Sequence, residues 1–393
     1  MKPILATEKT CTGCLACVDT CAKSALTKII GEDGHIYVRV DESKCVGCGL
    51  CEKSCPIVSG LPYGTSDIAT AFAGWAKNDV VRRNSATAGA FSSLALYVFS
   101  LGGYVCGAAI VDGIYVKHIC INNISELQRL QGSKYTQSDA SGIYKTVYEK
   151  LKEGSIVLFS GTGCQVAGLY GYLKSKKYTG RLITIDLICG GVPSRLLIQK
   201  FIENEPFQTR EIISFRSKDN GWKPNGFKYN LKVIDTDGTL HDYTGKRNLI
   251  TTGFACEMTD RYSCYDCKFA GLHRMSDFTI GDYWGVKEYP EQHFNGVSAI
   301  IAHNKYALEL LKASSAYLEV KEADISDINK HSRRLVAHPD KRYKLPERKY
   351  MAKIFNTCSY TTLKRIYAFD FGKFSPWMLY KVYRTIASKI INR

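Results

Sequence analysis

Apolar and polar positions follow two different spacings along this chain. Short apolar runs predict strands at Tyr104–Ile110, Ser155–Ser160 and Leu182–Ile188. Longer apolar segments predict helices over Ala86–Ser100 and from Cys164 onward. Because the strands alternate with helices, the chain is predicted to contain a large α/β core with some α+β character.

Two further patterns predict hairpins. Apolar runs lie on either side of a Gly/Asp turn between Ile29 and Val38, and Phe227–Val233 and Thr239–Tyr243 flank a second turn at Asp237-Gly238. These patterns divide the chain into three predicted parts. They are a small α+β domain at residues 1–62, an α/β (α+β mixed) domain at 66–325 and a helical extension at 326–393.

Eight of the sixteen cysteines lie within residues 11–55 and form an internal repeat. The spacing C-x2-C-x2-C-x3-C occurs twice, displaced by 34 residues. It is typical of bacterial ferredoxins, in which three cysteines of one loop bind one 4Fe–4S cluster and the fourth reaches the other cluster. The sequence therefore predicts a ferredoxin-like domain with two 4Fe–4S clusters, one bound by Cys11, Cys14, Cys17 and Cys55 and the other by Cys45, Cys48, Cys51 and Cys21.

A pair of structural zinc sites is the alternative interpretation of these cysteines. Zinc favours two separated CxxC pairs around one ion, so the observed spacing argues for iron–sulfur clusters. One difference from the ferredoxin pattern is Ala22, which stands where a proline often follows the fourth cysteine, whereas Pro56 is present in the second repeat. Two neighbouring clusters conduct electrons, and the rest of the chain is then expected to hold a redox cofactor and a substrate site.

The net charge of +16 is concentrated at the C-terminus, where Asp340 to Arg393 contain thirteen Lys and Arg against three Asp and Glu. No nucleic-acid reading module accompanies this charge, so a nucleic-acid partner is not expected. The N-terminus has no apolar signal segment and no stretch is apolar enough to span a membrane, which predicts a cytoplasmic protein.

Several sequence blocks between residues 70 and 300 resemble a known family. Asn84–Phe91 and Gly102–Ala108 resemble the N-terminal block of the coenzyme F420 hydrogenase/dehydrogenase beta-subunit family. Similar blocks follow at Gly132–Ser138, Leu158–Gln165, Asp186–Ser194, Arg261–Phe269 and Ser276–Gly285. Two departures are Gly163, where the family usually has proline, and Gly190, where bacterial members often have a titratable histidine.

The resemblance implies an iron–sulfur flavoprotein, with residues 66–325 as its catalytic domain. As an FAD-dependent oxidoreductase, it would pass electrons between its clusters and a small organic substrate, either coenzyme F420-like or an intermediate of a polysaccharide pathway. Ferredoxin or another redox protein would be its electron partner. The alternative is a non-catalytic electron-transfer subunit that docks on a partner enzyme. No residue is assigned as a catalytic acid or base.

Four cysteines of the large domain are candidates for a third 4Fe–4S cluster. In the resembling family, cysteines of the corresponding motifs are the expected ligands, which here are Cys164, Cys189, Cys264 and Cys267. The alternative is that Cys164 and Cys189 are small buried core residues. The CxxC pair lies in a polar segment, where burial does not explain it, and this favours the cluster.

The same resemblance places FAD at a loop of small residues. Ser85, Thr87 and Gly89 precede an apolar helix, and a helix N-terminus is suited to a pyrophosphate. Lys134 and Gln137 are candidates to hold the phosphates or the ring. A simple helix cap is the alternative, since no GxGxxG supports a dinucleotide fold of the Rossmann type.

The last segment, Pro376–Arg393, has apolar residues at helical spacing with basic residues largely opposite. A basic amphipathic helix can lie in a membrane interface, which would place the protein peripherally at the inner face of the membrane. Packing of the apolar face on the protein body is the alternative, and the more common one.

Overall fold

The structure is a computed structural model that describes residues 2–60, 68–219, 221–222, 231–244, 248–255, 257, 259–332, 334–336 and 351–368. The amphipathic C-terminal segment and its predicted membrane contact therefore lie outside the described residues. Within those ranges, none of the helices is long and apolar enough to cross a membrane.

The N-terminal module is built from two similar halves. Its helices are α1 (Ala16–Thr20) and α2 (Leu50–Ser54), and its strands β1 (Leu26–Ile30) and β2 (Ile36–Val40) form an antiparallel hairpin between them. The cysteine repeat extends to the backbone: Gly13 and Gly47 both have φ of 67°, and the residues before the two helices, Leu15 and Gly49, have φ of 67° and 69°. The predicted ferredoxin-like hairpin and repeat are confirmed.

The core of the molecule is an eight-stranded mixed sheet, in the order β13-β3-β12-β11-β7-β6-β4-β5. The strands are β3 (Thr70–Ala76), β4 (Tyr104–Val111), β5 (Tyr115–Ile121), β6 (Ile156–Ser160), β7 (Arg181–Leu187), β11 (Phe278–Asp282), β12 (Ser298–Ala302) and β13 (Leu318–Glu322). The four central strands β4, β6, β7 and β11 run parallel, and the outer pairs are antiparallel. Covered on both faces, the central strand β6 is almost continuously apolar, and the middle of β7 is buried as well.

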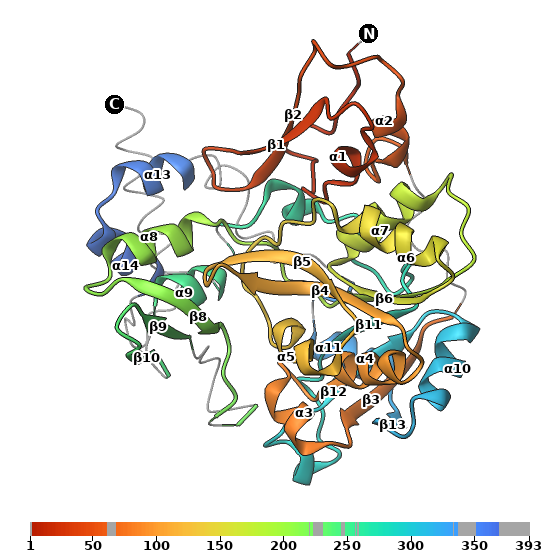
Figure 1. Cartoon of the computed structure of the whole chain (residues 1–393). Helices are drawn as coiled ribbons and strands as arrows, with labels where there is room; N and C mark the ends of the chain where they lie inside the picture. The colour runs from red at the N-terminus through yellow and green to blue at the C-terminus, as the bar shows by residue number, and fades with distance from the viewer. Residues whose placement is uncertain are drawn as a thin grey trace.

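Helices cover both faces of this sheet (Figure 1). The helices α6 (Ile143–Lys152) and α7 (Gly163–Leu173) pack on one face, and α4 (Ala90–Ser100) and α10 (Lys305–Ala313) on the other. Shorter helical segments connect the strands: α3 (Asp79–Asn84), η1 (Ile124–Glu126), α5 (Leu127–Leu130), η2 (Tyr262–Asp266), η3 (Pro290–Gln292) and α11 (Ile325–His331). The layers confirm the predicted mixed α/β class.

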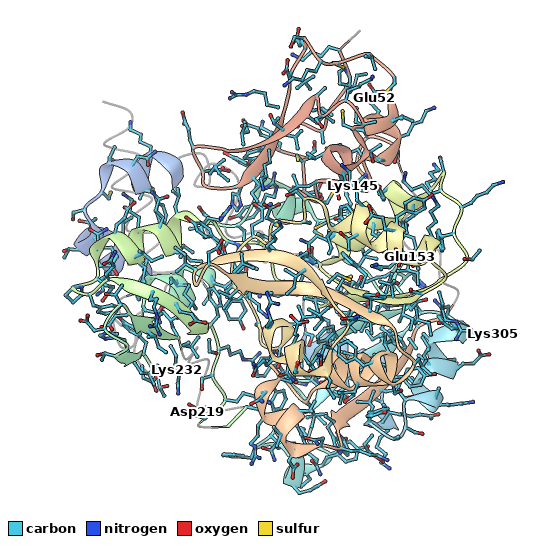
Figure 2. The ribbon with its side chains drawn as sticks, in the orientation of Figure 1. Glu52, Lys145, Glu153, Asp219, Lys232 and Lys305 are labelled. Atoms are coloured by element: carbon cyan, nitrogen blue, oxygen red, sulfur yellow. The ribbon has the colours of Figure 1, made fainter. Side chains whose placement is uncertain are left out.

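A smaller unit lies beside the sheet, at the left of Figure 1. It holds the antiparallel sheet β10-β9-β8, with β8 (Thr209–Ser214), β9 (Lys232–Asp235) and β10 (Leu240–Asp242), and the helices α8 (Leu196–Asn204), α9 (Leu249–Ala255), α13 (Met351–Thr357) and α14 (Tyr360–Ala368). Lys232 forms an ion pair with Asp219 at its edge (Figure 2). The second predicted hairpin corresponds to β9 and β10.

The N-terminal module is fixed to the sheet domain by buried polar contacts. The carboxylate of Asp19 accepts hydrogen bonds from the backbone amides of Gly142 and Tyr144, at 2.6 and 3.1 Å, and so caps α6 from another part of the chain. The Tyr144 hydroxyl donates to the carbonyl of Cys14 at 2.8 Å. Lys145, on the same helix, lies directly below the module in Figure 2. The module is therefore packed against α6 and not tethered by its linker alone.

Replacing Asp19 by alanine is expected to lower the free energy of unfolding by about 1–3 kcal/mol, because two buried amides at the start of α6 lose a charged acceptor. Chemical denaturation of the cluster-loaded protein measures this. The control is Asp79→Ala, which removes an exposed carboxylate from the first turn of α3. Equal stability of the D19A and D79A proteins would contradict the docking role of Asp19.

Candidate iron–sulfur and cofactor sites

The first cysteine group, Cys11, Cys14, Cys17 and Cys55, is gathered around the start of α1. Burial raises the pKa of the Cys14 thiol to about 12, and the nearby charges of Cys55 and Cys11 raise it further. Burial also raises the pKa of Cys17, and Cys14, Cys11 and Cys55 all contribute. Cys55 of the second half of the repeat thus lies near three cysteines of the first half, and their assignment to one cluster stays a prediction.

The second cysteine group, Cys21, Cys45, Cys48 and Cys51, lies farther from the sheet domain. Cys48 is exposed, and it is one of the charges that raise the pKa of Cys51, although burial contributes most. Cys21 follows directly after α1, and the helices α1 and α2 are in contact. Assignment of all four to one cluster stays a prediction.

The third cysteine group brings together Cys164, Cys189, Cys264 and Cys267 from three segments. Cys164 is the second residue of α7, Cys189 follows β7, and the CxxC pair lies in and after η2. Burial raises the pKa of Cys189 to about 11, with Cys267 adding to the effect. Burial raises the pKa of Cys264 as well, and Cys189, Cys164 and Cys267 contribute. Thiols so buried lose their protons when a metal binds them.

The first and third groups approach the same helix, α7, at positions one turn apart. Cys164 belongs to the third group, and Gly168 lies four residues later on the same face of the helix. A Cβ atom at Gly168 would lie 3.1 Å from Cys14 Sγ, so this glycine allows the first group to approach. The charge of Cys14 also contributes to the raised pKa of Cys164, after burial and the other thiols.

No three Cys, His, Asp or Glu side chains are close enough to hold a single metal ion, within the part of the chain that the structure describes. In a cubane cluster each cysteine binds a different iron, so four ligands lie farther apart than those of one ion.

A cavity of about 620 Å³ opens beside the third group. Its wall includes the carboxyl ends of the neighbouring strands β6, β7 and β11, where α/β sheets commonly bind ligands. Cys189 is part of this wall. The volume is in the range of cofactor and ligand sites.

Four of the residues predicted for FAD line this cavity: Ser85, Thr87, Gly89 and Lys134. The helix behind them begins at Ala90 and not at Ala86, because Gly89 adopts φ of 90° and ends the preceding loop. No side chain caps this helix. Gly89, Ala90 and Phe91, at the start of this helix, form part of the cavity wall.

Lys134 and His118 provide polar groups in the cavity wall. Burial lowers the pKa of Lys134 to about 7, and its ammonium group donates to the carbonyl of Gln131 at 2.7 Å. Burial lowers the pKa of His118 to about 4. The histidine is therefore neutral near pH 7, with Nδ1 at 2.8 Å from the Ser138 hydroxyl and Nε2 at 3.1 Å from the Ser160 carbonyl.

Gln137, the fifth residue predicted for FAD, is not part of the cavity wall. Its side-chain oxygen accepts a 2.8 Å hydrogen bond from the backbone amide of Ile36 in the N-terminal module. Its position in the structure is thus at the interface between the module and the sheet domain.

The sequence patterns did not single out Arg216, Asp282 and Trp284, which form part of the cavity wall. Arg216 makes two hydrogen bonds to Asp282, at 2.9 and 3.1 Å, and lies over the ring of Trp284. Asp282 also accepts from Thr87 at 2.8 Å. The terminal position of Asp282 on a central strand was the available signal in the sequence.

Comparison with known proteins supports the resemblance drawn from the sequence blocks. Residues 154–326 match the sequence model for the C terminus of the beta subunit of coenzyme F420 hydrogenase/dehydrogenase, and residues 5–61 match a 4Fe-4S dicluster domain. The recognition of these two domains is thereby confirmed. No match was found among curated proteins.

Among solved structures, a chain of the F420-reducing NiFe hydrogenase complex from Methanosarcina barkeri aligns with a TM-score of 0.48 and 15% identity. The alignment covers 70% of this chain and 90% of that chain.

Gly168→Ala is expected to lower both the thermal midpoint and the iron content. The added methyl would lie 3.0 Å from Cys14 Cβ and 3.0 Å from the Tyr144 hydroxyl, and overpacking of this kind costs about 1–3 kcal/mol. Calorimetry and iron analysis measure the two effects. Lys174→Ala, at an exposed position after the same helix, is the control. A G168A protein as stable and as rich in iron as K174A would show that the approach of Cys14 to α7 is not tight.

Proposed function

We propose that this chain, an iron–sulfur protein that combines a dicluster domain with a domain of the F420 hydrogenase/dehydrogenase beta-subunit type, carries electrons between its N-terminal surface and the cavity. The second cysteine group includes the exposed Cys48 and is the entry or exit point for an electron partner such as a ferredoxin. The first and third groups follow in order toward the sheet.

One observation carries this proposal: the third cysteine group has the first group on one side and the cavity on the other. Gly168 packs against Cys14, and Cys189 lines the cavity. Electrons hop between redox centres only over short distances, so centres held in this order form a continuous path. Cysteines with a structural role alone would not require two groups in line with a cavity.

The residues present fit 4Fe–4S clusters. Each predicted group consists of four thiols, and those of the first and third groups are mutually close and at least partly buried. When bound, such clusters take up and release single electrons. The chain's own contribution is to hold the thiols, exclude water from the inner groups and fix the distance between them.

The cavity fits a flavin by the character of its wall. A helix N-terminus without a side-chain cap supplies amide donors for phosphate oxygens, and the Lys134 amino group supplies a further donor. Gly107 and Ala108 leave a wall without bulky side chains. FAD, when bound, exchanges electrons both singly and in pairs, which links one-electron clusters to hydride chemistry. We therefore propose Ser85, Thr87, Gly89 and Lys134 as its binding residues.

Two forms of this function differ in where the electrons go. In the first, the chain itself is an oxidoreductase that reduces or oxidises a small organic substrate, coenzyme F420-like or from a polysaccharide pathway. In the second, it is an electron-transfer subunit that docks on a partner enzyme. The matched family is described as a beta subunit, which supports the second form more directly. A peripheral membrane contact of the basic C-terminal segment is a separate part of the proposal and rests on the sequence pattern alone.

The iron content distinguishes two clusters from three. The intact protein is expected to hold about twelve iron atoms per chain, at four per cluster. The double variant Cys264→Ser/Cys267→Ser is expected to fall to about eight, because two ligands of the third group are lost. Cys358→Ser, outside all three groups, is the control. Iron and sulfide analysis with electron paramagnetic resonance measures the difference, and unchanged iron in the double variant would rule out the third cluster.

The flavin assignment is tested by filling the cavity. Gly107 lines it, and a Cβ atom there would be in ordinary contact with Leu130 and Phe91, at 3.7 and 3.8 Å, so a larger side chain takes up space at this part of the wall. Gly107→Leu is expected to purify with little or no flavin but with the full iron content. Tyr115→Leu, at an exposed position of the neighbouring strand β5, is the control. Flavin release and absorbance give the content. Equal flavin in both variants, or none in the unaltered protein, would contradict the assignment.

A further inference from the structure

Arg261 is a buried arginine that lies between the first and third cysteine groups. We propose that its guanidinium is the counter-charge of the first cluster and raises the reduction potential of that cluster. The inference rests on the proposed function, because it requires a 4Fe–4S cluster at Cys11, Cys14, Cys17 and Cys55.

The side chain of Arg261 is completely inaccessible to solvent. Its hydrogen-bond acceptors are both uncharged: Nε donates to the carbonyl of Cys11 at 2.6 Å, and Nη1 donates to the amide oxygen of Gln137 at 3.4 Å. The guanidinium carbon lies 4.4 Å from the ring centre of Tyr37. The remaining nitrogen, Nη2, donates to no atom among the residues that the structure describes.

A buried cation is costly unless an anion compensates it. A 4Fe–4S cluster with four thiolate ligands carries net negative charge in both its common oxidation states, and its sulfides and thiolates accept hydrogen bonds. Such a cluster at the first group would supply both the missing charge and an acceptor close to Nη2. The position of the guanidinium beside Cys11 places it next to this cluster.

The backbone fixes Arg261 at this position from both sides. Its amide donates to the carbonyl of Val192 at 2.9 Å, and its carbonyl accepts from the amide of Cys264 at 2.9 Å. The side chain then reaches Cys11 across the interface between the domains. Gly13 has no side chain at this point, and a Cβ atom there would lie 2.7 Å from Nη1. The backbone of Arg261 is therefore held beside the third cysteine group, and its side chain extends to the first group.

The neighbouring carboxylate, Asp260, lies near Gly191 and the third group. Its Oδ2 would lie 2.0 Å from a Cβ atom at Gly191, and its charge contributes to the raised pKa values of Cys189 and Cys264, chiefly caused by burial. Asp260 thus adds negative charge near the third group, whereas Arg261 adds positive charge near the first.

The experiment compares reduction potentials of the clusters in the complete, cluster-loaded chain. Potentials are measured by redox titration followed with electron paramagnetic resonance, and the signal of the first cluster is identified as the one that Cys17→Ser alters. Arg261→Gln should shift the potential of the first cluster to a more negative value, and Arg261→Lys, which keeps the charge, should shift it less. The second cluster is the internal control and should not change.

A second variant tests the charge without removing the arginine. Gln137→Glu keeps an acceptor for the Ile36 amide and puts a carboxylate 3.4 Å from Nη1, so it should lower the potential of the first cluster as R261Q does. If R261Q does not fold, the reduction potential of the first cluster in Q137E provides the test. An unchanged potential of the first cluster in R261Q, or in Q137E, would overturn the inference alone. A wild-type chain without that cluster would overturn the proposed function together with it.

Discussion

The packing of the N-terminal module on helices α6 and α7 is the constraint on which the proposed electron path depends. Cys14 lies against Gly168, and the Tyr144 hydroxyl joins the carbonyl of Cys14 to that of Gln165 on α7. If the module were only tethered, the distance between the first and third groups would vary, and with it the rate of electron transfer. Because the contact is buried and hydrogen-bonded, the distance is set by the fold.

The sheet explains why the other end of the path opens into a cavity. Three neighbouring parallel strands, β6, β7 and β11, end at the same edge, and the loops that leave them diverge. The divergence leaves space for a ligand, and the same loops carry Cys164 and Cys189. The third cysteine group and the cavity are therefore adjacent by topology, without a special segment to join them.

Local sequence patterns were sufficient for most of the helices and strands and for the ferredoxin-like repeat, whereas the division of the cysteines among clusters stays a prediction. The strands Tyr104–Ile110, Ser155–Ser160 and Leu182–Ile188 differ from the observed strands by a residue at one end or both, because apolar runs between glycines leave little freedom. The helix predicted from Ala86 begins later, since apolar composition cannot show the left-handed turn at Gly89.

Contacts between distant segments were beyond the reach of the sequence. Gln137 was predicted for the cofactor, yet in the structure its amide bonds to Ile36, about a hundred residues away in the chain. Asp19 capping α6 and Arg261 reaching Cys11 depend in the same way on how the two domains dock. Asp19 lies between two cysteines of the repeat and Arg261 opens one of the family-like blocks, but neither pattern shows which distant residue each side chain contacts.

The two halves of the cysteine repeat have not remained equivalent. In the outer half the left-handed position before the helix is Gly49, which adopts this conformation without strain. In the inner half the same position is Leu15, which is buried and adopts the left-handed conformation at a cost of about 1–2 kcal/mol. The two copies of the duplicated motif thus differ: the inner copy has become part of the protein core, whereas the outer copy has kept a glycine that adopts its conformation without strain.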